Sequence, residues 1–266
     1  MDMPVNVFKR KIATPDVAYG AWLSASSAST AEALGCAGYD FLVVDMEHSP
    51  IEFPQVVEIL RAIAGTPASP MTRVPWNDMV MIKRALDAGA QTLLLPLIQD
   101  ADEARRAVAY TRYPPDGVRG VAGMQRAGRY GMVANYARHA ADELCVVVQI
   151  ETVAALAQLE RIAEVPGVDS IFIGPSDLAA SMGHLGDIMH TDVQRNLEQA
   201  AKDCRRIGIP CGCLGGNPEM TLRFRDYGYS WMAMGSDIGM LVSRAQEWLA
   251  AVGQAPPAKG KAAGAY

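Results

Sequence analysis

Short apolar runs alternate with amphipathic segments along almost the whole chain. Eight of these runs are apolar on both faces and are bounded by Gly, Pro or Asp, which is typical of strands buried within a parallel sheet. The predicted strands are residues 20–23, 40–45, 70–74, 92–98, 144–150, 170–174, 209–214 and 231–235.

The segments between these strands carry apolar residues at helical spacing. In residues 53–64, for example, Val56, Leu60 and Ile63 share one face. The predicted helices are residues 53–64, 78–88, 101–111, 152–164, 192–207, 217–227 and 238–252. A glycine recurs where a helix ends before the next strand, which suits a left-handed cap. These glycines are Gly38, Gly89, Gly167, Gly208 and Gly228.

Eight strands, most of them followed by a helix, predict an α/β fold of the (β/α)₈ barrel type. We expect one domain over residues 1–254 and a flexible C-terminal tail at residues 255–266. A doubly wound open sheet is the alternative. It requires a Gly-rich turn after the first strand, and residues 24–29 contain no glycine.

The composition narrows the range of partners. The 266 residues are 50% hydrophobic, carry a net charge of −5 and contain no run of lysine and arginine, so we expect no nucleic-acid partner. We also expect no membrane association, because there is no signal-peptide core and no apolar run of ~20 residues. The five cysteines lack zinc-type spacing, and Cys211 and Cys213 are interpreted as small buried residues. These features predict a cytoplasmic protein.

Two acidic residues, Glu151 and Asp177, follow predicted strands that are neighbours along the chain. In a parallel barrel both carboxylates emerge at the same carboxyl-terminal edge, where they repel unless a cation lies between them. Oxygen ligands favour a hard divalent ion such as Mg²⁺ or Mn²⁺. Gln149 lies two residues before Glu151 and shares its face, so it joins this predicted site. The alternative is that both acids only cap helices.

A cation and a histidine extend the predicted site. Arg73 interrupts an apolar strand and needs an anion, which is either a substrate oxygen or the carboxylate of Asp45 or Glu47. His48 follows Asp45 by three residues, so Asp45 is placed to orient the imidazole as a general base. The alternative is that His48 is an ordinary surface histidine.

None of the six lysines ends a predicted strand. Schiff-base catalysis needs a desolvated lysine in the barrel mouth. We therefore expect any carbonyl chemistry to be metal-assisted.

Six segments in order along the chain resemble the HpcH/HpaI aldolase family, and within it the metal-dependent (class II) pyruvate aldolases. The similarity extends from about residue 17 to residue 250. The segments are Tyr39–His48, Arg73–Asp78, Gln91–Pro96, Arg112–Gly120, Val148–Thr152 and Ile173–Leu178.

The resemblance implies reversible aldol cleavage of a 2-keto-4-hydroxy acid to pyruvate and an aldehyde. The substrate would be a 4-hydroxy-2-oxo diacid or a 2-keto-3-deoxy sugar acid. The resemblance also implies that Glu151 and Asp177 bind the divalent ion, with Co²⁺ as a further candidate beside Mg²⁺ and Mn²⁺. Arg73 would hold the keto or enolate oxygen, and His48 with Asp45 would form the acid–base pair.

The rest of the implied site surrounds the substrate. Backbone amides around Gly174, Ser176 and Asp177 would hold the pyruvate carboxylate, Pro175 would contact the substrate beside them, and Trp22 and Leu214 would form an apolar wall. Asp87 matches an acid that reaches a neighbouring subunit's site. The family relation further implies a hexamer built as a trimer of dimers, with a last helix that can be exchanged between subunits.

Residues 120–130 differ from the Gly-Ser-Ala-Leu-Ala-Arg pattern of the family's heptanedioate enzymes, at a loop expected to meet the aldehyde. The acceptor therefore stays open. Three other functions also stay open: a CoA-ester lyase of the same superfamily, a metal-free sugar-phosphate isomerase and a non-catalytic binding barrel. Gly215–Asn217 and Gly235–Asp237 follow the last two strands, where many barrels bind phosphate.

Overall fold

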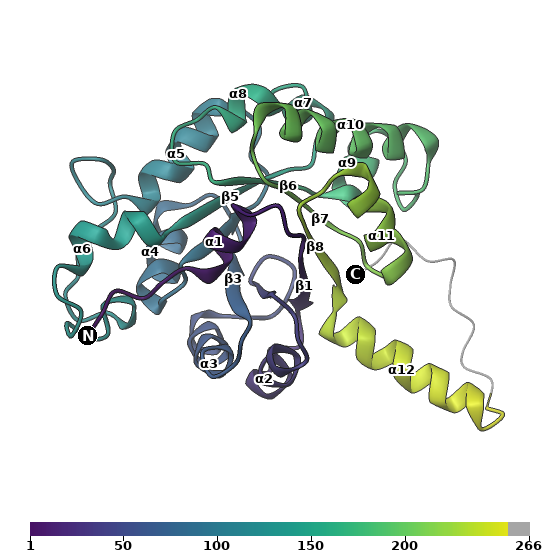
Figure 1. The fold of residues 1–266 in the computed structure, drawn as a ribbon, viewed down its shortest axis with the longest axis horizontal. Coiled ribbons are helices and arrows are strands. Elements are labelled where there is room, and N and C mark those ends of the chain that lie inside the picture. Colours follow the sequence, from purple (N-terminus) through teal and green to yellow (C-terminus); the bar gives the residue numbers. More distant parts are fainter. Residues whose placement is uncertain (255–266) are drawn as a thin grey trace.

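The computed structural model describes residues 1–254, which form a closed barrel of eight parallel strands in sequence order (Figure 1). This confirms the predicted (β/α)₈ barrel and excludes the open sheet. The predicted tail at residues 255–266 lies outside the described residues. The strands are β1 (Ala18–Leu23), β2 (Phe41–Asp45), β3 (Ser69–Arg73), β4 (Thr92–Leu95), β5 (Cys145–Ile150), β6 (Ser170–Ile173), β7 (Cys211–Leu214) and β8 (Trp231–Ser236).

All seven predicted helical segments are helical, although residues 152–164 form two short helices instead of one. The sequence analysis did not predict α1, α6 or α9, and it gave only the glycine end at Gly38 and no bounds for α2. The helices are α1 (Val7–Ile12), α2 (Ala28–Cys36), α3 (Phe53–Ile63), α4 (Met79–Ala88), α5 (Ala101–Thr111), α6 (Tyr136–His139), α7 (Val153–Leu156), α8 (Leu159–Ala163), α9 (Pro175–Ser181), α10 (Thr191–Ile207), α11 (Pro218–Tyr227) and α12 (Asp237–Ala251). Two 3₁₀ turns lie at Arg126–Gly128 and Ala140–Glu143.

Three of the five predicted glycines are helix caps, whereas Gly38 and Gly167 have positive φ but follow the caps Ala37 and Glu164. Gly89, Gly208 and Gly228 cap α4, α10 and α11 with φ of 103°, 84° and 108°. A residue with a Cβ is disfavoured in this left-handed conformation, so each glycine ends its helix and turns the chain toward the next strand.

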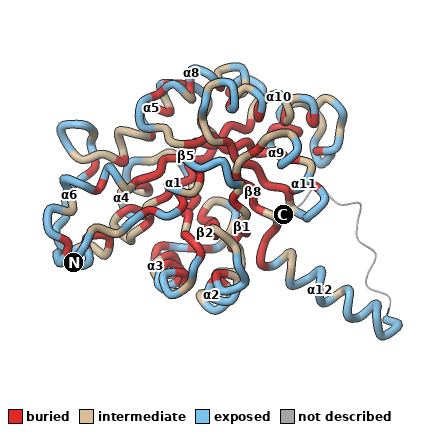
Figure 2. Tube along the Cα trace, in the orientation of Figure 1, coloured by how far each residue is buried: buried red, intermediate tan, exposed pale blue. Residues whose placement is uncertain are grey.

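Two apolar cores hold the barrel together. One lies between the strands and the surrounding helices, and the other fills the barrel interior (Figure 2). The unpredicted helix α1 closes the amino-terminal end, where Phe8 packs edge-on against Phe41 and Trp231 at ring-centroid distances of 5.1 and 5.4 Å. Because one end is closed, a substrate has to approach the interior from the carboxyl ends of the strands. Cys211 and Cys213 are buried free thiols, as predicted.

Helix α12 departs from the usual barrel pattern. It projects away from the barrel instead of packing on it, and most of its length is exposed (Figures 1 and 2). Its start is anchored, because the buried carboxylate of Asp237 accepts hydrogen bonds from the backbone N–H groups of Ser24 and Ala25 at 2.9 and 3.1 Å. Within residues 1–254, no helix is both long and apolar enough to span a membrane.

Candidate active site

Arg73 lies at the carboxyl end of β3, directly beside Asp45 at the end of β2. Its Nε and Nη2 donate to the two Asp45 carboxylate oxygens at 2.8 and 2.7 Å, and its Nη1 lies 2.9 Å from Glu47 Oε2. Arg73 and Asp45 are each 1% exposed. The guanidinium is therefore held rigidly by both of the carboxylates that the sequence proposed as alternatives.

Asp45 is the centre of the turn that follows β2. Besides Arg73, its carboxylate accepts from the backbone N–H groups of Glu47 and His48 at 3.0 and 3.3 Å and from the Ser49 hydroxyl at 3.3 Å. Burial alone raises the pKa of Asp45, but the hydrogen bonds and charge of Arg73 outweigh burial and lower the pKa below its ordinary value. Asp45 is therefore an ionised carboxylate that fixes Arg73 and the turn.

His48 is the exposed member of this turn. Its side chain is 52% exposed, and its Nε2 lies 3.9 Å from Glu47 Oε1. The contact with the Asp45 carboxylate runs through the His48 backbone N–H. His48 thus lies at the barrel mouth as predicted, and Glu47 is a nearby carboxylate that the sequence analysis had considered only as a partner of Arg73.

Glu151 follows β5 and is 2% exposed. Gln149 Nε2 donates a short hydrogen bond to Glu151 Oε2, and the backbone N–H of Leu97 donates to Oε1 at 2.9 Å. Leu97 adopts a left-handed φ of 55°, which is rare for a residue with a branched side chain. This strained backbone directs its N–H toward the buried carboxylate.

The surroundings of Glu151 oppose its negative charge. Burial raises its pKa from the ordinary 4.5 to about 7, and the charges of Asp177 and Glu47 push in the same direction. Burial also raises the pKa of Glu47. The carboxylates of buried Glu151, partly buried Glu47 and exposed Asp177 therefore influence one another, and Arg73 is the cation paired with Glu47 there.

This donor set fits a divalent cation. Gln149 Oε1 is buried and has no hydrogen-bond partner among the described residues. An ion, or a water bound to it, would satisfy this amide oxygen and neutralise the neighbouring carboxylates. Carboxylate and amide oxygens are the ligands of hard ions such as Mg²⁺ and Mn²⁺.

Asp177 lies in the first turn of α9, immediately after β6, and its residue is exposed. A small cavity of about 10 Å³, with room for about one water molecule, lies beside it. The structure brings together here the eight residues predicted to bind substrate, whereas Glu151, Asp45, His48 and Asp87 do not line this cavity. The cavity is lined by Trp22, Arg73, Gln149, Phe172, Gly174, Pro175, Ser176, Asp177 and Leu214.

The segment after β6 corrects one prediction. The backbone N–H of Gly174 already donates to Ile150 O at 3.0 Å, and Pro175 has no N–H. Neither residue therefore has an amide to offer a carboxylate, which leaves the N–H groups of Ser176 and Asp177. Gly174 has a different role: a Cβ added there would lie 2.7 Å from Glu151 Oε2, so only glycine leaves space for that side chain.

A wider pocket of about 800 Å³ opens outside the small cavity and shares Ser176 and Asp177 with it. His48 and Asp45 line one side, and the first half of α12 lines another through Ile238 and Val242. The small cavity admits about one water-sized group, such as a single substrate oxygen, and the wider pocket leaves room for the rest of a substrate.

Asp87 lies far from this set within its own chain. It is near the end of α4, at the amino-terminal end of the barrel, where its carboxylate accepts from Arg119 Nη2 at 2.7 Å. Arg126, in the divergent loop, donates to Ala88 O at 2.9 Å at the same end. Asp87 and this loop can therefore contact only the barrel mouth of another copy of the chain.

The sequence analysis missed Phe172 and Leu97. Phe172 pairs in register with Gln149, so its inward position followed from the strand alternation. No local sequence pattern predicts the left-handed backbone of Leu97. Trp22 was predicted as an apolar wall, but its indole N–H is also buried and lacks a hydrogen-bond partner among residues 1–254, so it offers a donor.

Comparison with known proteins identifies the class. Residues 18–244 match the HpcH/HpaI aldolase/citrate lyase family. The chain is 48% identical over 241 residues to 2-dehydro-3,6-dideoxy-6-sulfogluconate aldolase of Pseudomonas putida, covering 90% of this chain and 94% of that protein. It is 45% identical over 247 residues to 4-hydroxy-2-oxo-heptane-1,7-dioate aldolase of Klebsiella pneumoniae, covering 92% and 93%.

The solved structures agree. A family protein from Burkholderia cenocepacia superposes with a TM-score of 0.91 at 42% identity, covering 93% of this chain and 99% of that one. A more distant protein of the same fold, CitE of Mycobacterium tuberculosis, has a TM-score of 0.56 at 15% identity and was solved with magnesium and pyruvate. The family match and the relatives of about 45% identity show that the chain is a carbon–carbon lyase. The chain belongs to the HpcH/HpaI aldolase/citrate lyase family, as an enzyme of the pyruvate aldolase type.

Proposed function

We propose that this enzyme uses a divalent cation, Mg²⁺ or Mn²⁺ with Co²⁺ as a further candidate, held by Glu151 and Asp177. It would cleave a 2-keto-4-hydroxy acid to pyruvate and an aldehyde. The observation that carries the proposal is Glu151 itself, a buried carboxylate whose charge is opposed by burial and by two neighbouring acids, beside the unpartnered Gln149 Oε1. A cation is the partner that this arrangement lacks.

The bound cation would supply Lewis-acid polarisation of the keto group. Arg73 lines the same cavity, and Asp45 and Glu47 hold its guanidinium in place before substrate arrives. Its positive charge is therefore preorganised toward the oxygen that becomes negative when the C3–C4 bond breaks. Preorganised charge of this kind is commonly the largest contribution to such catalysis.

The remaining contacts orient the substrate. The N–H groups of Ser176 and Asp177 are the free amides at the pyruvate end, and Trp22 offers its unpartnered indole N–H. His48, exposed on the wider pocket, is the candidate for removing the proton from the 4-hydroxyl, directly or through water. Leu214 and Phe172 keep the inner end apolar.

The aldehyde part of the substrate would bind in the wider pocket. Its volume accommodates the chain of a diacid or a sugar acid, the two substrate types of the relatives. We infer that a neighbouring subunit's Asp87 and divergent loop reach this pocket, because both lie at the other end of their own barrel.

We further infer a hexamer, built as a trimer of dimers in which α12 packs on another subunit. An apolar groove of about 320 Å³ lies between β1, β8 and α11, where an eighth barrel helix ordinarily packs. Tyr19, Tyr39, Leu222 and Met234 line it. Helix α12 of another copy would pack into this groove. The free cysteines suit a reducing cytoplasm.

The test is a chelation experiment. After exhaustive treatment with EDTA, aldol cleavage is expected to fall to background. It should return when Mg²⁺ or Mn²⁺ is added but not with metal-free buffer alone. Treatment with borohydride in the presence of pyruvate serves as the control, and it should leave activity intact because no imine forms. Full activity in the metal-free enzyme would refute the proposal.

A further inference from the structure

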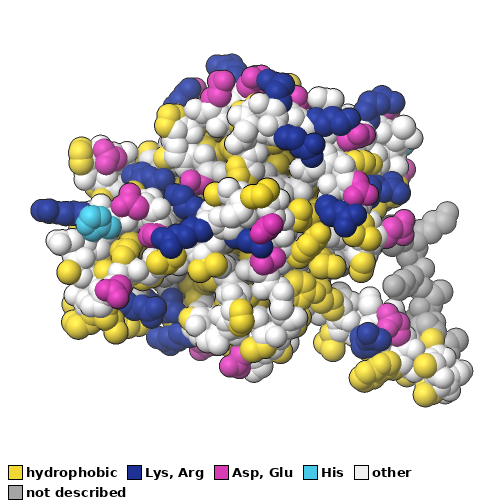
Figure 3. All heavy atoms as spheres, in the orientation of Figure 1, with side chains coloured by type: hydrophobic (Ala, Val, Ile, Leu, Met, Phe, Trp, Pro, Cys, Tyr) yellow, Lys and Arg dark blue, Asp and Glu magenta, His cyan; other side chains and the backbone are white. Residues whose placement is uncertain are grey.

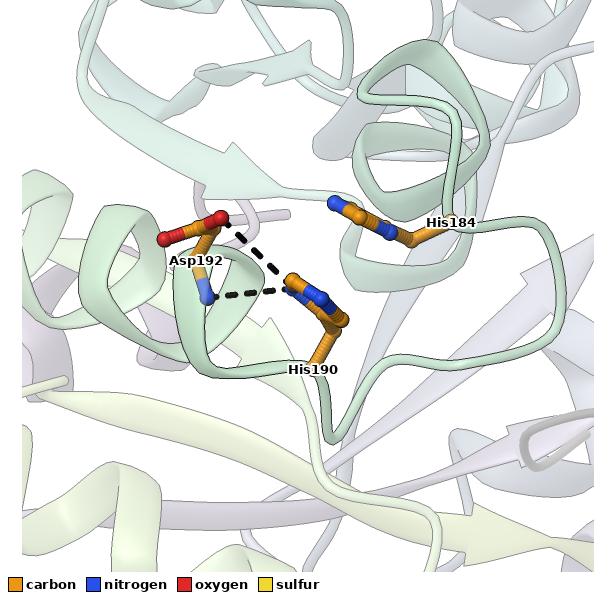
Figure 4. Close-up of side chains that lie close together, drawn as sticks. All are labelled: His184, His190 and Asp192. Carbon is orange, nitrogen blue, oxygen red and sulfur yellow. Dashed lines mark hydrogen bonds and ion pairs between the residues drawn. The ribbon is translucent and has the colours of Figure 1, made fainter.

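A second group of metal-ligating side chains lies outside the active site, in the loop that joins α9 to α10. His184, His190 and Asp192 each offer a ligand atom there, and these atoms lie within 4.8 Å of one another (Figure 4). All three residues are half-buried. The sequence analysis assigned no role to either histidine, because neither ends a strand.

The contacts of the cluster engage His190 Nδ1 through one backbone N–H and one oxygen of Asp192 through Arg195. His190 Nδ1 accepts from the Asp192 backbone N–H at 3.2 Å and lies 3.8 Å from Asp192 Oδ2. Arg195 holds the other carboxylate oxygen, Asp192 Oδ1, at 3.1 Å. His190 Nδ1 and the second carboxylate oxygen therefore lie close together, and an ion would replace the hydrogen bond that Nδ1 now accepts.

The two imidazole rings are stacked, with their centroids 3.5 Å apart and their planes 15° apart (Figure 4). Parallel rings cannot both direct a nitrogen lone pair at one ion, so one ring has to turn on binding. Ligand atoms around a tetrahedral ion with bonds of ~2.1 Å lie about 3.4 Å apart, so the widest separation in the cluster must also shrink by up to about 1.4 Å. Gly183 and Gly186, both at positive φ, make the intervening loop adaptable.

We infer that His184, His190 and Asp192 form a second metal site, selective for a borderline transition ion of the Zn²⁺ type. Two imidazoles and one carboxylate are the ligands of such ions, whereas Mg²⁺ prefers oxygen ligands alone. The fourth position is left to water. Binding of the ion replaces the hydrogen bond from the Asp192 backbone N–H to His190 Nδ1, so α10 loses this N-cap.

A bound ion would tie the α9–α10 loop to the first turn of α10. Helix α9 precedes this loop and begins with Asp177, so the site lies one short helix away from the active site. The ion is expected to rigidify the loop rather than take part in catalysis. The Zn²⁺ site and the Mg²⁺ site thus use different donor atoms and are separable by metal chemistry.

The experiment is a calorimetric titration of ZnCl₂ into the EDTA-stripped full chain. The wild type, His184→Ala and a matched control, His139→Ala, are compared. His139 is exposed and its only ion pair among the described residues is with Asp142, so its loss should leave zinc binding unchanged. His184→Ala is expected to lose one equivalent of zinc, or to weaken it by roughly 100-fold, since even outer-shell partners are worth 10–100-fold.

Two further measurements make the result decisive. Anomalous diffraction from a zinc-soaked wild-type crystal should show a peak between His184 and His190. Glu151→Gln should leave this equivalent in place, so a failure of the proposed active-site metal can be told apart from a failure here. Equal zinc stoichiometry and affinity in wild type and His184→Ala, or no anomalous peak at the cluster, would overturn the inference.

Discussion

Arg73 illustrates how one buried side chain can serve both structure and catalysis. Because Asp45 and Glu47 both bind it, Arg73→Ala would leave both carboxylates without their cation, at a cost of roughly 3–5 kcal/mol. Arg73→Lys is the sharper test, since it keeps the charge but loses the bidentate fork. We expect turnover to fall by about 100-fold or more with unchanged metal affinity. Steady-state kinetics beside Mn²⁺ titration would check this, and a two-fold loss would leave Arg73 only a structural role.

Glu151 predicts an unusual dependence of stability on pH in the metal-free protein. Its pKa is about 7 in the folded chain and 4.5 ordinarily, so between these values the folded state holds a proton that the unfolded state has lost. Stability therefore falls as pH rises through this window, by about 3 kcal/mol. Glutamine does not titrate, so the stability of Glu151→Gln does not fall over this pH range. Its Tm in EDTA should match wild type at pH 5 and exceed it by roughly 5–10 °C at pH 8.

The comparison of two pH values supplies the internal control for Glu151. A packing defect caused by the substitution would shift Tm equally at pH 5 and pH 8. A constant offset across both values would therefore contradict the raised pKa.

At the scale of elements, the junction between β6 and α9 shapes the metal site. Gly174 has an ordinary φ of −83°, so alanine is not strained there, but its Cβ would lie 2.7 Å from Glu151 Oε2 and 2.9 Å from Glu151 Cβ. Gly174→Ala is expected to keep the fold and weaken Mn²⁺ binding at least about 10-fold, measured by calorimetry. Gly65→Ala is the matched control, because its Cβ meets only Ala62 O at 3.7 Å. Equal affinities in the two variants would refute this role.

The elements also show what sequence alone could predict. Strands such as β5 are apolar on both faces and are followed by a charged residue, so the strand positions and the grouping of Glu151, Gln149 and Arg73 at one end followed from periodicity. Helix α1 did not, because Phe8 and Ile12 in six residues give no measurable periodicity, and their burial depends on the open barrel end. The left-handed Leu97 and the facing of His184 and His190 likewise depend on loops whose paths only the folded chain defines.

For the whole molecule, the unusual feature is an apolar helix left in solvent. Ile238, Leu241, Val242, Trp248 and Leu249 are 45–69% exposed along α12, and Figure 3 shows hydrophobic side chains on this projecting arm. Their spacing of three, four and seven residues makes one apolar stripe. A stripe of this kind marks an interface. It can be buried only on another copy if α12 keeps its direction.

We therefore expect Leu241→Asp combined with Trp248→Asp to dissociate the assembly, because two charges would be buried in an apolar contact. Light scattering coupled to gel filtration should show a hexamer for wild type and a smaller species for the double variant. Arg244→Ala is the control on the same helix, since Arg244 pairs only with Glu247 among the contacts described. Activity should fall with the mass if neighbouring subunits complete the site through Asp87. A wild type that is monomeric, or a double variant of unchanged mass, would show that α12 does not hold subunits together.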